Sequence, residues 1–178
     1  MLDGWHEFYV LLGTAAAALV ALLFVAASIG EGYLSAERQS PTRTFTSPIV
    51  FHYTYVLFVS LVALIPKADG ALAAIIGVSA ALALLYSINI LVRVMRSRTI
   101  DLDDRLGYGA GPVAAYVAVV AACIFMIERS VAGPPLLAAG LILLLLVNIR
   151  NVWDLTVFFA QRRKDGGTSR EASRPPSL

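Results

Sequence analysis

Seven polar residues lie within or at the edges of long apolar stretches, where groups able to carry charge or hydrogen-bond are unusual: His52, Asn89, Arg93, Asn148, Arg150, Asn151 and Asp154. Hydrocarbon penalises such groups, so each needs a partner, access to the interface, or a function. At a helical period, Asn89 and Arg93 share an arc of about 80° with Tyr86 and Arg96. The four polar residues near 150 occupy about 160°, with Arg150 and Asp154 one turn apart.

Two interpretations of these residues stay open. In the first, the residues are structural: Arg93 and Asp154 extend to the interface from helix ends, and Arg150 pairs with Asp154. In the second, some of them form a ligand or ion site. For the deeper residues, His52, Asn148 and Arg150, an interior structural network and a ligand or ion site both fit the sequence. If the seven residues converge, they form one polar cluster in the cytoplasmic half of a helix bundle.

Other chemistry has little support in the sequence. The chain has two histidines, His6 and His52, which belong at opposite membrane faces and therefore should not share an iron. Its single cysteine, Cys123, lies in an apolar stretch and is expected to be a small buried side chain. No serine-hydrolase, zinc-protease or phosphate-loop pattern occurs. We therefore expect no cofactor, no metal site and no catalytic residue.

Five apolar segments must position the polar residues. Four contain no Asp, Glu, Lys or Arg over at least 18 residues, and the fifth is free of them over residues 131–149 and stays apolar to Ala160. Each is long enough to cross a hydrocarbon core of about 30 Å as a helix. The expected fold is an all-α, polytopic membrane helix bundle with spans at about 8–29, 48–65, 71–92, 106–127 and 134–159.

The basic residues predict the orientation of these spans. Lys67 and Arg129 would lie on one side of the membrane and eleven basic residues on the other, with Arg150 inside the last span. Cytoplasmic loops carry the excess of Lys and Arg, so the N-terminus is predicted outside and the C-terminus in the cytoplasm. A bacterial inner membrane is the expected location. The basic residues are explained by this orientation and by anionic lipids, and nucleic acid is not an expected partner.

The chain is expected to form one membrane domain, residues 1–160, followed by a basic tail, 161–178. The tail is polar and rich in Gly, Ser and Pro, which predicts disorder beyond Arg162, Arg163 and Lys164. Those three residues should contact anionic lipid headgroups. The fourth span either starts near Leu106 and kinks at Pro112 or begins at Pro112, and the kink gives the fuller length.

Rows of small residues predict close helix contacts, because small side chains let helix backbones approach in lipid. The rows are Gly13, Ala17 and Ala21; Ala73, Gly77 and Ala81; and Ala110, Ala114, Ala118 and Ala122. They favour a compact or self-associating bundle. The function expected from all these features is a non-catalytic accessory or scaffold subunit that binds a membrane-protein partner or a second copy. The alternative is a small oligomeric transporter or channel-like protein that uses the inner polar cluster.

Overall fold

The computed structural model describes residues 2–34, 42–66, 69–96 and 109–172. Over these residues the secondary structure is entirely helical, as the sequence predicted. A short 3-10 helix, η1 (Asp3–Trp5), precedes the α-helices. The α-helices are α1 (His6–Leu34), α2 (Thr42–Ala63), α3 (Asp69–Arg96), α5 (Gly111–Ile127) and α6 (Gly133–Ala172).

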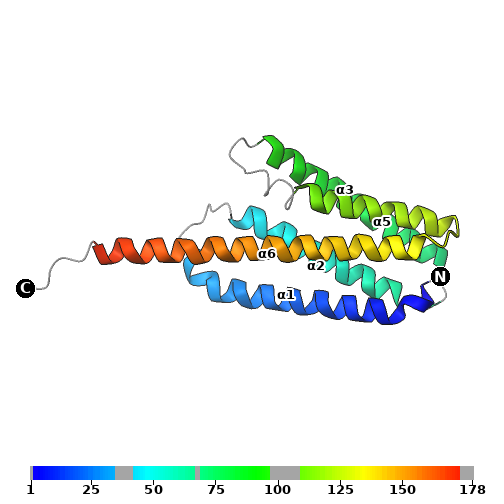
Figure 1. The fold of residues 1–178 in the computed structure, drawn as a ribbon, viewed down its shortest axis with the longest axis horizontal. Coiled ribbons are helices and arrows are strands. Elements are labelled where there is room, and N and C mark those ends of the chain that lie inside the picture. Colours follow the sequence, from blue (N-terminus) through cyan, green and yellow to red (C-terminus); the bar gives the residue numbers. More distant parts are fainter. Residues whose placement is uncertain (1, 35–41, 67–68, 97–108, 173–178) are drawn as a thin grey trace, which may run out of the picture.

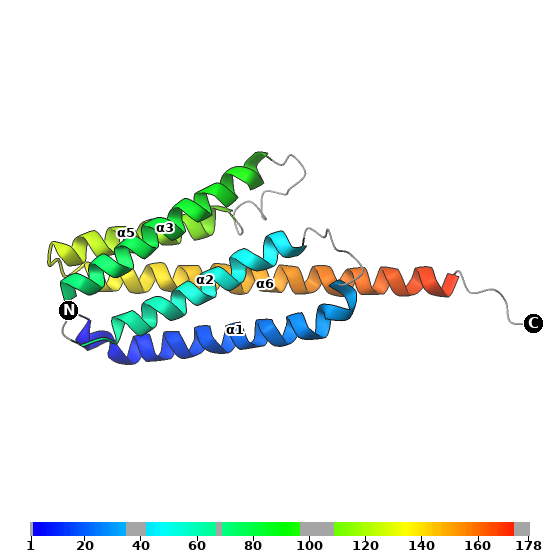
Figure 2. The same cartoon turned by 180° about the vertical axis from the view of Figure 1, so that it is seen from behind.

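The helices alternate in direction along one long axis (Figure 1). α1, α3 and α6 begin, and α2 and α5 end, at one end of the bundle, which we call the N-terminal end. α1 packs on α2, α3 packs on α5, and α6 packs on both α5 and α2. The α1–α2 pair and the α3–α5 pair are therefore joined through α6. α2 and α3 meet at few residues, and the two views show them diverging toward the opposite end (Figure 2).

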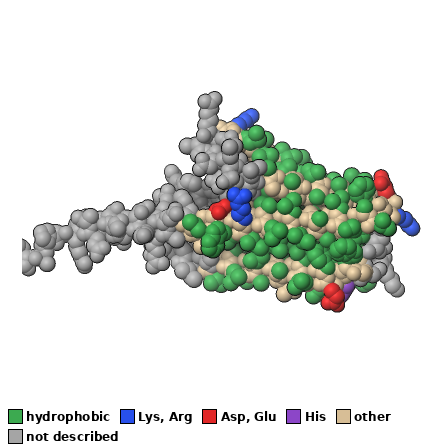
Figure 3. Space-filling view, in the orientation of Figure 1, with side chains coloured by type: hydrophobic (Ala, Val, Ile, Leu, Met, Phe, Trp, Pro, Cys, Tyr) green, Lys and Arg blue, Asp and Glu red, His purple; other side chains and the backbone are tan. Residues whose placement is uncertain are grey.

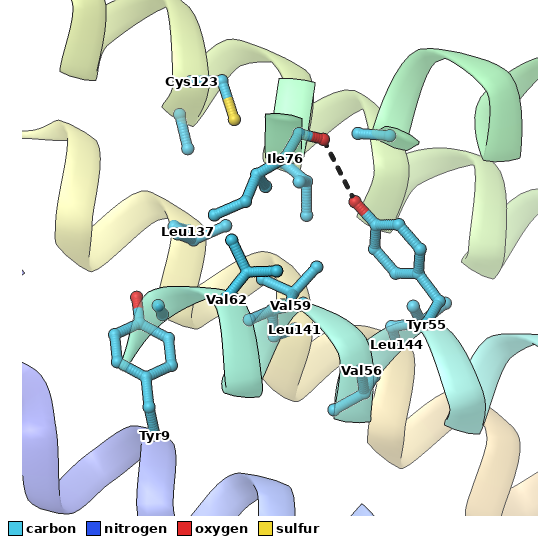
Figure 4. Close-up of a cluster of buried hydrophobic side chains, with 14 of the residues drawn as sticks. Tyr9, Tyr55, Val56, Val59, Val62, Ile76, Cys123, Leu137, Leu141 and Leu144 are labelled. Carbon is cyan, nitrogen blue, oxygen red and sulfur yellow. Dashed lines mark hydrogen bonds between the residues drawn. The ribbon is translucent and has the colours of Figure 1, made fainter. Parts of the chain in front are cut away.

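The core consists of stripes of buried side chains spaced three and four residues apart. On α6 the stripe begins with Leu137, Leu141 and Leu144, and on α2 it includes Val56 and Val59. Alternating steps of three and four keep one face of a helix toward its neighbour. Figure 4 draws Val59 at the level of Leu141 and Val56 at the level of Leu144, as expected for antiparallel helices in register.

Glycines mark the closest approaches between helices. A Cβ placed on Gly140 of α6 would lie 3.0 Å from Val119 Cγ2 and 3.2 Å from the backbone oxygen of Ala115, both on α5. Gly13 approaches Ser60 of α2, and Gly77 approaches Cys123 of α5. Close backbone contact is how helices gain packing energy in lipid.

The rows of small residues were predicted only in part. Gly13 is buried, but Ala17 and Ala21 are exposed, because the packed face of α1 runs through Ala16 instead. On α3, Ala73 is buried and Ala81 is exposed. The residues of the remaining row range similarly from buried Ala122 to exposed Ala114. Alanine is so frequent that its spacing does not identify the packed face.

Among the residues that the structure describes, three helices are long and apolar enough to cross a membrane by length and composition: His6–Val25, Gly70–Arg96 and Gly133–Asp154. The apolar parts of α2 and α5, Pro48–Ala63 and Gly111–Ile127, are shorter. Figure 3 shows hydrophobic side chains over the visible lateral face and charged side chains toward its ends. That distribution is the one expected of a protein surrounded by lipid.

Helical backbone extends to both sides of Pro112. α5 begins at Gly111 with Pro112 in its first turn, and residues 109–110 directly before it are π-helical. The alternative start near Leu106 lies outside the described residues. Disorder was predicted beyond Lys164, but α6 continues to Ala172. Adding residues to an existing helix avoids the cost of nucleation, and the next proline is Pro175.

The turn between α5 and α6 stores backbone strain at Arg129. Its φ of 59° lies in the left-handed region, which residues other than glycine rarely adopt. The amide of Arg129 donates to the carbonyl of Met126, and that of Ser130 donates to the carbonyl of Phe125 at 2.8 Å. These two bonds form a Schellman motif, which satisfies carbonyls at the end of α5.

Candidate functional site

A buried pair of polar side chains joins α2 to α5. His52 Nδ1 and the hydroxyl of Tyr116 are 2.8 Å apart, and their rings lie 5.6 Å apart between centroids. His52 is 2% exposed and Tyr116 is fully buried. Each lies about 16 Å along its helix from the N-terminal end, measured from Ala63 and Ile127. The pair is therefore near the middle of the bundle, where a histidine or tyrosine without a hydrogen bond is costly.

Aromatic side chains extend this pair toward α3. Tyr55 packs edge-to-face on Tyr116 with centroids 4.9 Å apart, and its hydroxyl donates to the carbonyl of Ile76 at 3.5 Å (Figure 4). Phe51 meets Tyr86 of α3 at 4.9 Å between centroids. α2 and α3 thus meet through rings.

Two tyrosines that complete this site, Tyr55 and Tyr116, were not predicted from the sequence. A usable signal was present, because each hydroxyl lies in an apolar stretch and must find a partner there. Choosing among the seven tyrosines required knowing which helix faces meet.

The polar residues of α6 divide between two faces. Asn148 and Asn151 are buried and continue the stripe of Leu137, Leu141 and Leu144 beyond its apolar part. The side-chain amide of Asn148 donates to the carbonyl of Leu144 at 2.7 Å. Continuing the α2–α6 register by four residues on each helix, from Val56 and Leu144, brings His52 opposite Asn148. Three of the seven predicted site residues are therefore buried at the centre of the bundle.

Arg150 and Asp154 lie on the outer surface of α6. Their side chains are 50% and 40% exposed, and Arg150 Nε is 3.8 Å from Asp154 Oδ2. The predicted pairing one turn apart is present. Its separation and exposure make it a weak ion pair, and it does not point toward His52.

Asn89 and Arg93 are exposed on α3. The amide of Asn89 donates to the carbonyl of Leu85 at 2.8 Å, within its own helix. The structure therefore does not bring these two residues into contact with the buried pair. The headgroup-binding side chains predicted at Arg162, Arg163 and Lys164 lie outside the described side chains.

The buried site is equipped for hydrogen bonding. Imidazole, phenol and amide groups donate and accept hydrogen bonds without a formal charge, which suits a low-dielectric interior. Among the described residues, no group of three or more His, Cys, Asp or Glu is placed to hold a metal ion. No family model matches the chain, and no match was found among curated proteins or solved structures.

Proposed function

We propose that this chain is a five-span protein of a bacterial inner membrane that serves as a non-catalytic accessory or scaffold subunit. Its N-terminus is outside and its C-terminus cytoplasmic, as the distribution of basic residues favours. α5, at about 25 Å, spans with local thinning of the bilayer or with help from the turn before it. In this role the partner is a second membrane protein.

The length of α6 is the observation that carries this proposal. Its 40 residues reach about 60 Å, whereas the apolar part ends at Asp154 after about 33 Å. The remaining helix adds about 27 Å at the end opposite the N-terminal end, and it includes Arg162, Arg163 and Lys164. A helix that leaves the membrane carrying basic residues is suited to contact anionic headgroups and a partner's cytoplasmic surface.

Reporter fusions test the orientation. A reporter active only outside should work after Lys67 or Arg129 and should fail after Arg43, Arg98 or Lys164. The reverse pattern at two sites contradicts the orientation. Reporter activity outside the membrane after Lys164 would mean that the chain has one span fewer than proposed.

Cross-linking in native membranes, followed by purification in mild detergent, tests the subunit role. A stoichiometric protein partner is expected, and its recovery should fall when Arg162, Arg163 and Lys164 are all replaced by glutamate. The matched control replaces Arg170 and Arg174, which lie farther along the tail. Equal recovery of the partner with the unchanged protein, the triple variant and the control variant contradicts a role for Arg162, Arg163 and Lys164 in binding.

The alternative is a small oligomeric transporter or channel-like protein with its polar site in the cytoplasmic half. Burial of His52, Asn148 and Asn151 on facing helices favours it. The same purification separates the two functions, since a homo-oligomer without a protein partner supports the alternative. Solute flux into proteoliposomes that is lost in Asn148→Leu would then identify the site.

A further inference from the structure

The side chain of Asn148 has a buried acceptor on the packed face of α6. Its Nδ2 donates to the carbonyl of Leu144 at 2.7 Å, which fixes which end of the amide is nitrogen. Oδ1 is therefore the remaining end. It is buried, and within the described residues it has no hydrogen-bond partner. A buried carbonyl oxygen left in this condition loses the energy of its hydration without replacement.

The helix register identifies the residue of α2 at the same level as Asn148. Val56 of α2 lies at the level of Leu144 of α6 (Figure 4). The helices are antiparallel, so the residue four before Val56 on α2 lies at the level of the residue four after Leu144 on α6. That level contains His52 and Asn148, both at most 2% exposed.

The second ring nitrogen of His52 is the matching group. Its Nδ1 is engaged with the hydroxyl of Tyr116, which leaves Nε2 for a second partner. If Tyr116 donates to Nδ1, Nε2 carries a hydrogen and acts as a donor. If Nδ1 donates to Tyr116, Nε2 is an acceptor, as Asn148 Oδ1 is. Two acceptors cannot bond each other, but one water molecule has a hydrogen for each.

We propose that a buried water molecule bridges His52 Nε2 and Asn148 Oδ1. Water fits both tautomers of the histidine, because it accepts from Nε2 in one and donates to it in the other, while donating to Asn148 in both. A buried water typically has two to four polar partners, and these two come from facing helices. The bridge extends a chain from Tyr116 on α5 through α2 to α6, and it is independent of either proposed function.

Solid-state NMR on the full chain in lipid bilayers tests the bridge. The chain has two histidines, so labelling histidine with nitrogen-15 gives signals from His6 and His52 only, and His6→Ala assigns them. Magnetisation transferred from water should reach Nε2 of His52 in the otherwise unchanged protein. In Asn148→Leu the transfer should fall several-fold, because the water loses one of its two partners.

Asn89→Leu is the matched control, since it makes the same chemical change at an exposed position bonded within α3. It should leave transfer to His52 unchanged. Absence of water transfer to Nε2 in the unchanged protein overturns the proposal, and that measurement needs no variant that might misfold. Equal transfer in the unchanged protein and in Asn148→Leu also overturns it, because His52 would then be hydrated without Asn148.

Discussion

The contact between α5 and α6 at Gly140 gives a sharp test of how the bundle is packed. In Gly140→Ala, the new Cβ would lie 3.0 Å from Val119 Cγ2, 3.2 Å from the oxygen of Ala115 and 3.3 Å from the nitrogen of Val119. Two of these three atoms belong to the backbone of α5, so a change of rotamer cannot relieve them. The two helices must instead separate by a few tenths of an ångström.

The expected loss of stability follows from two opposing terms. Overpacking of this kind costs about 1–3 kcal/mol. Replacing a helical glycine with alanine returns about 0.5–1 kcal/mol, because the unfolded chain loses freedom. The net prediction is a loss of about 1–2 kcal/mol, or roughly 2–8 °C in melting temperature for a chain of this size. Gly140→Leu should be considerably worse.

The single cysteine provides the assay. Cys123 lies on α5 and is 2% exposed, so a thiol-reactive fluorescent dye reports its exposure as the protein unfolds in detergent. Gly70→Ala is the control, because a Cβ at Gly70 meets nothing within 4 Å. It should be neutral or slightly stabilising. A Gly140→Ala protein at least as stable as the unchanged chain would refute the close approach of α5 and α6.

Three further substitutions are testable with the same dye. Tyr116→Phe should lower the free energy of unfolding by about 1–3 kcal/mol, because buried His52 loses its hydrogen-bond partner. Adding His52→Phe should restore part of the lost stability, and additive losses from the two substitutions would argue against the pair. Arg150→Ala should leave Asp154 poorly paired. The coupling energy of the two residues, measured in a double-mutant cycle with Asp154→Asn, should stay below about 1 kcal/mol because both side chains are exposed to solvent. A coupling energy above about 2 kcal/mol would contradict the weak pair. Arg129→Gly should raise the free energy of unfolding by about 1 kcal/mol by removing the left-handed strain, whereas Arg129→Ala should not; equal effects would place the strain elsewhere.

The existence of the helices followed from the sequence, but their ends did not. Long apolar stretches are unambiguous, and the α-helices lie where they were expected. Ends depend on local energies that composition does not separate. Pro112 is compatible with a kink or with a first turn, and it lies in the first turn of α5 directly after the π-helical residues 109–110. The polar residues after Gln161 could be helical or disordered. They continue α6 to Ala172, because extending an existing helix avoids the cost of nucleation.

The candidate site was predicted in part for a related reason. His52 and Asn148 were singled out correctly as buried polar residues, because hydrocarbon penalises them wherever they point. Arg150 was placed in the same cluster, but it lies on the outer surface of α6. A helix that is apolar on all sides does not reveal which face is packed. Tyr116 was missed for the same reason, since only the α2–α5 contact makes it a partner of His52.

The packing of the bundle changes character along its axis. Gly13, Gly77 and Gly140 each lie about 10–12 Å from the N-terminal end of their helices, so three close contacts on different helix pairs occur at one level. Farther along, His52 and Asn148 replace apolar residues in the same stripes, and α2 meets α3 through the rings of Phe51 and Tyr86. Backbone contact at glycine admits little adjustment, whereas rings and hydrogen bonds rearrange at lower cost. The three glycine contacts near the N-terminal end thus bring helices close at glycine, whereas the contacts at the level of His52 are made by larger side chains that can change rotamer.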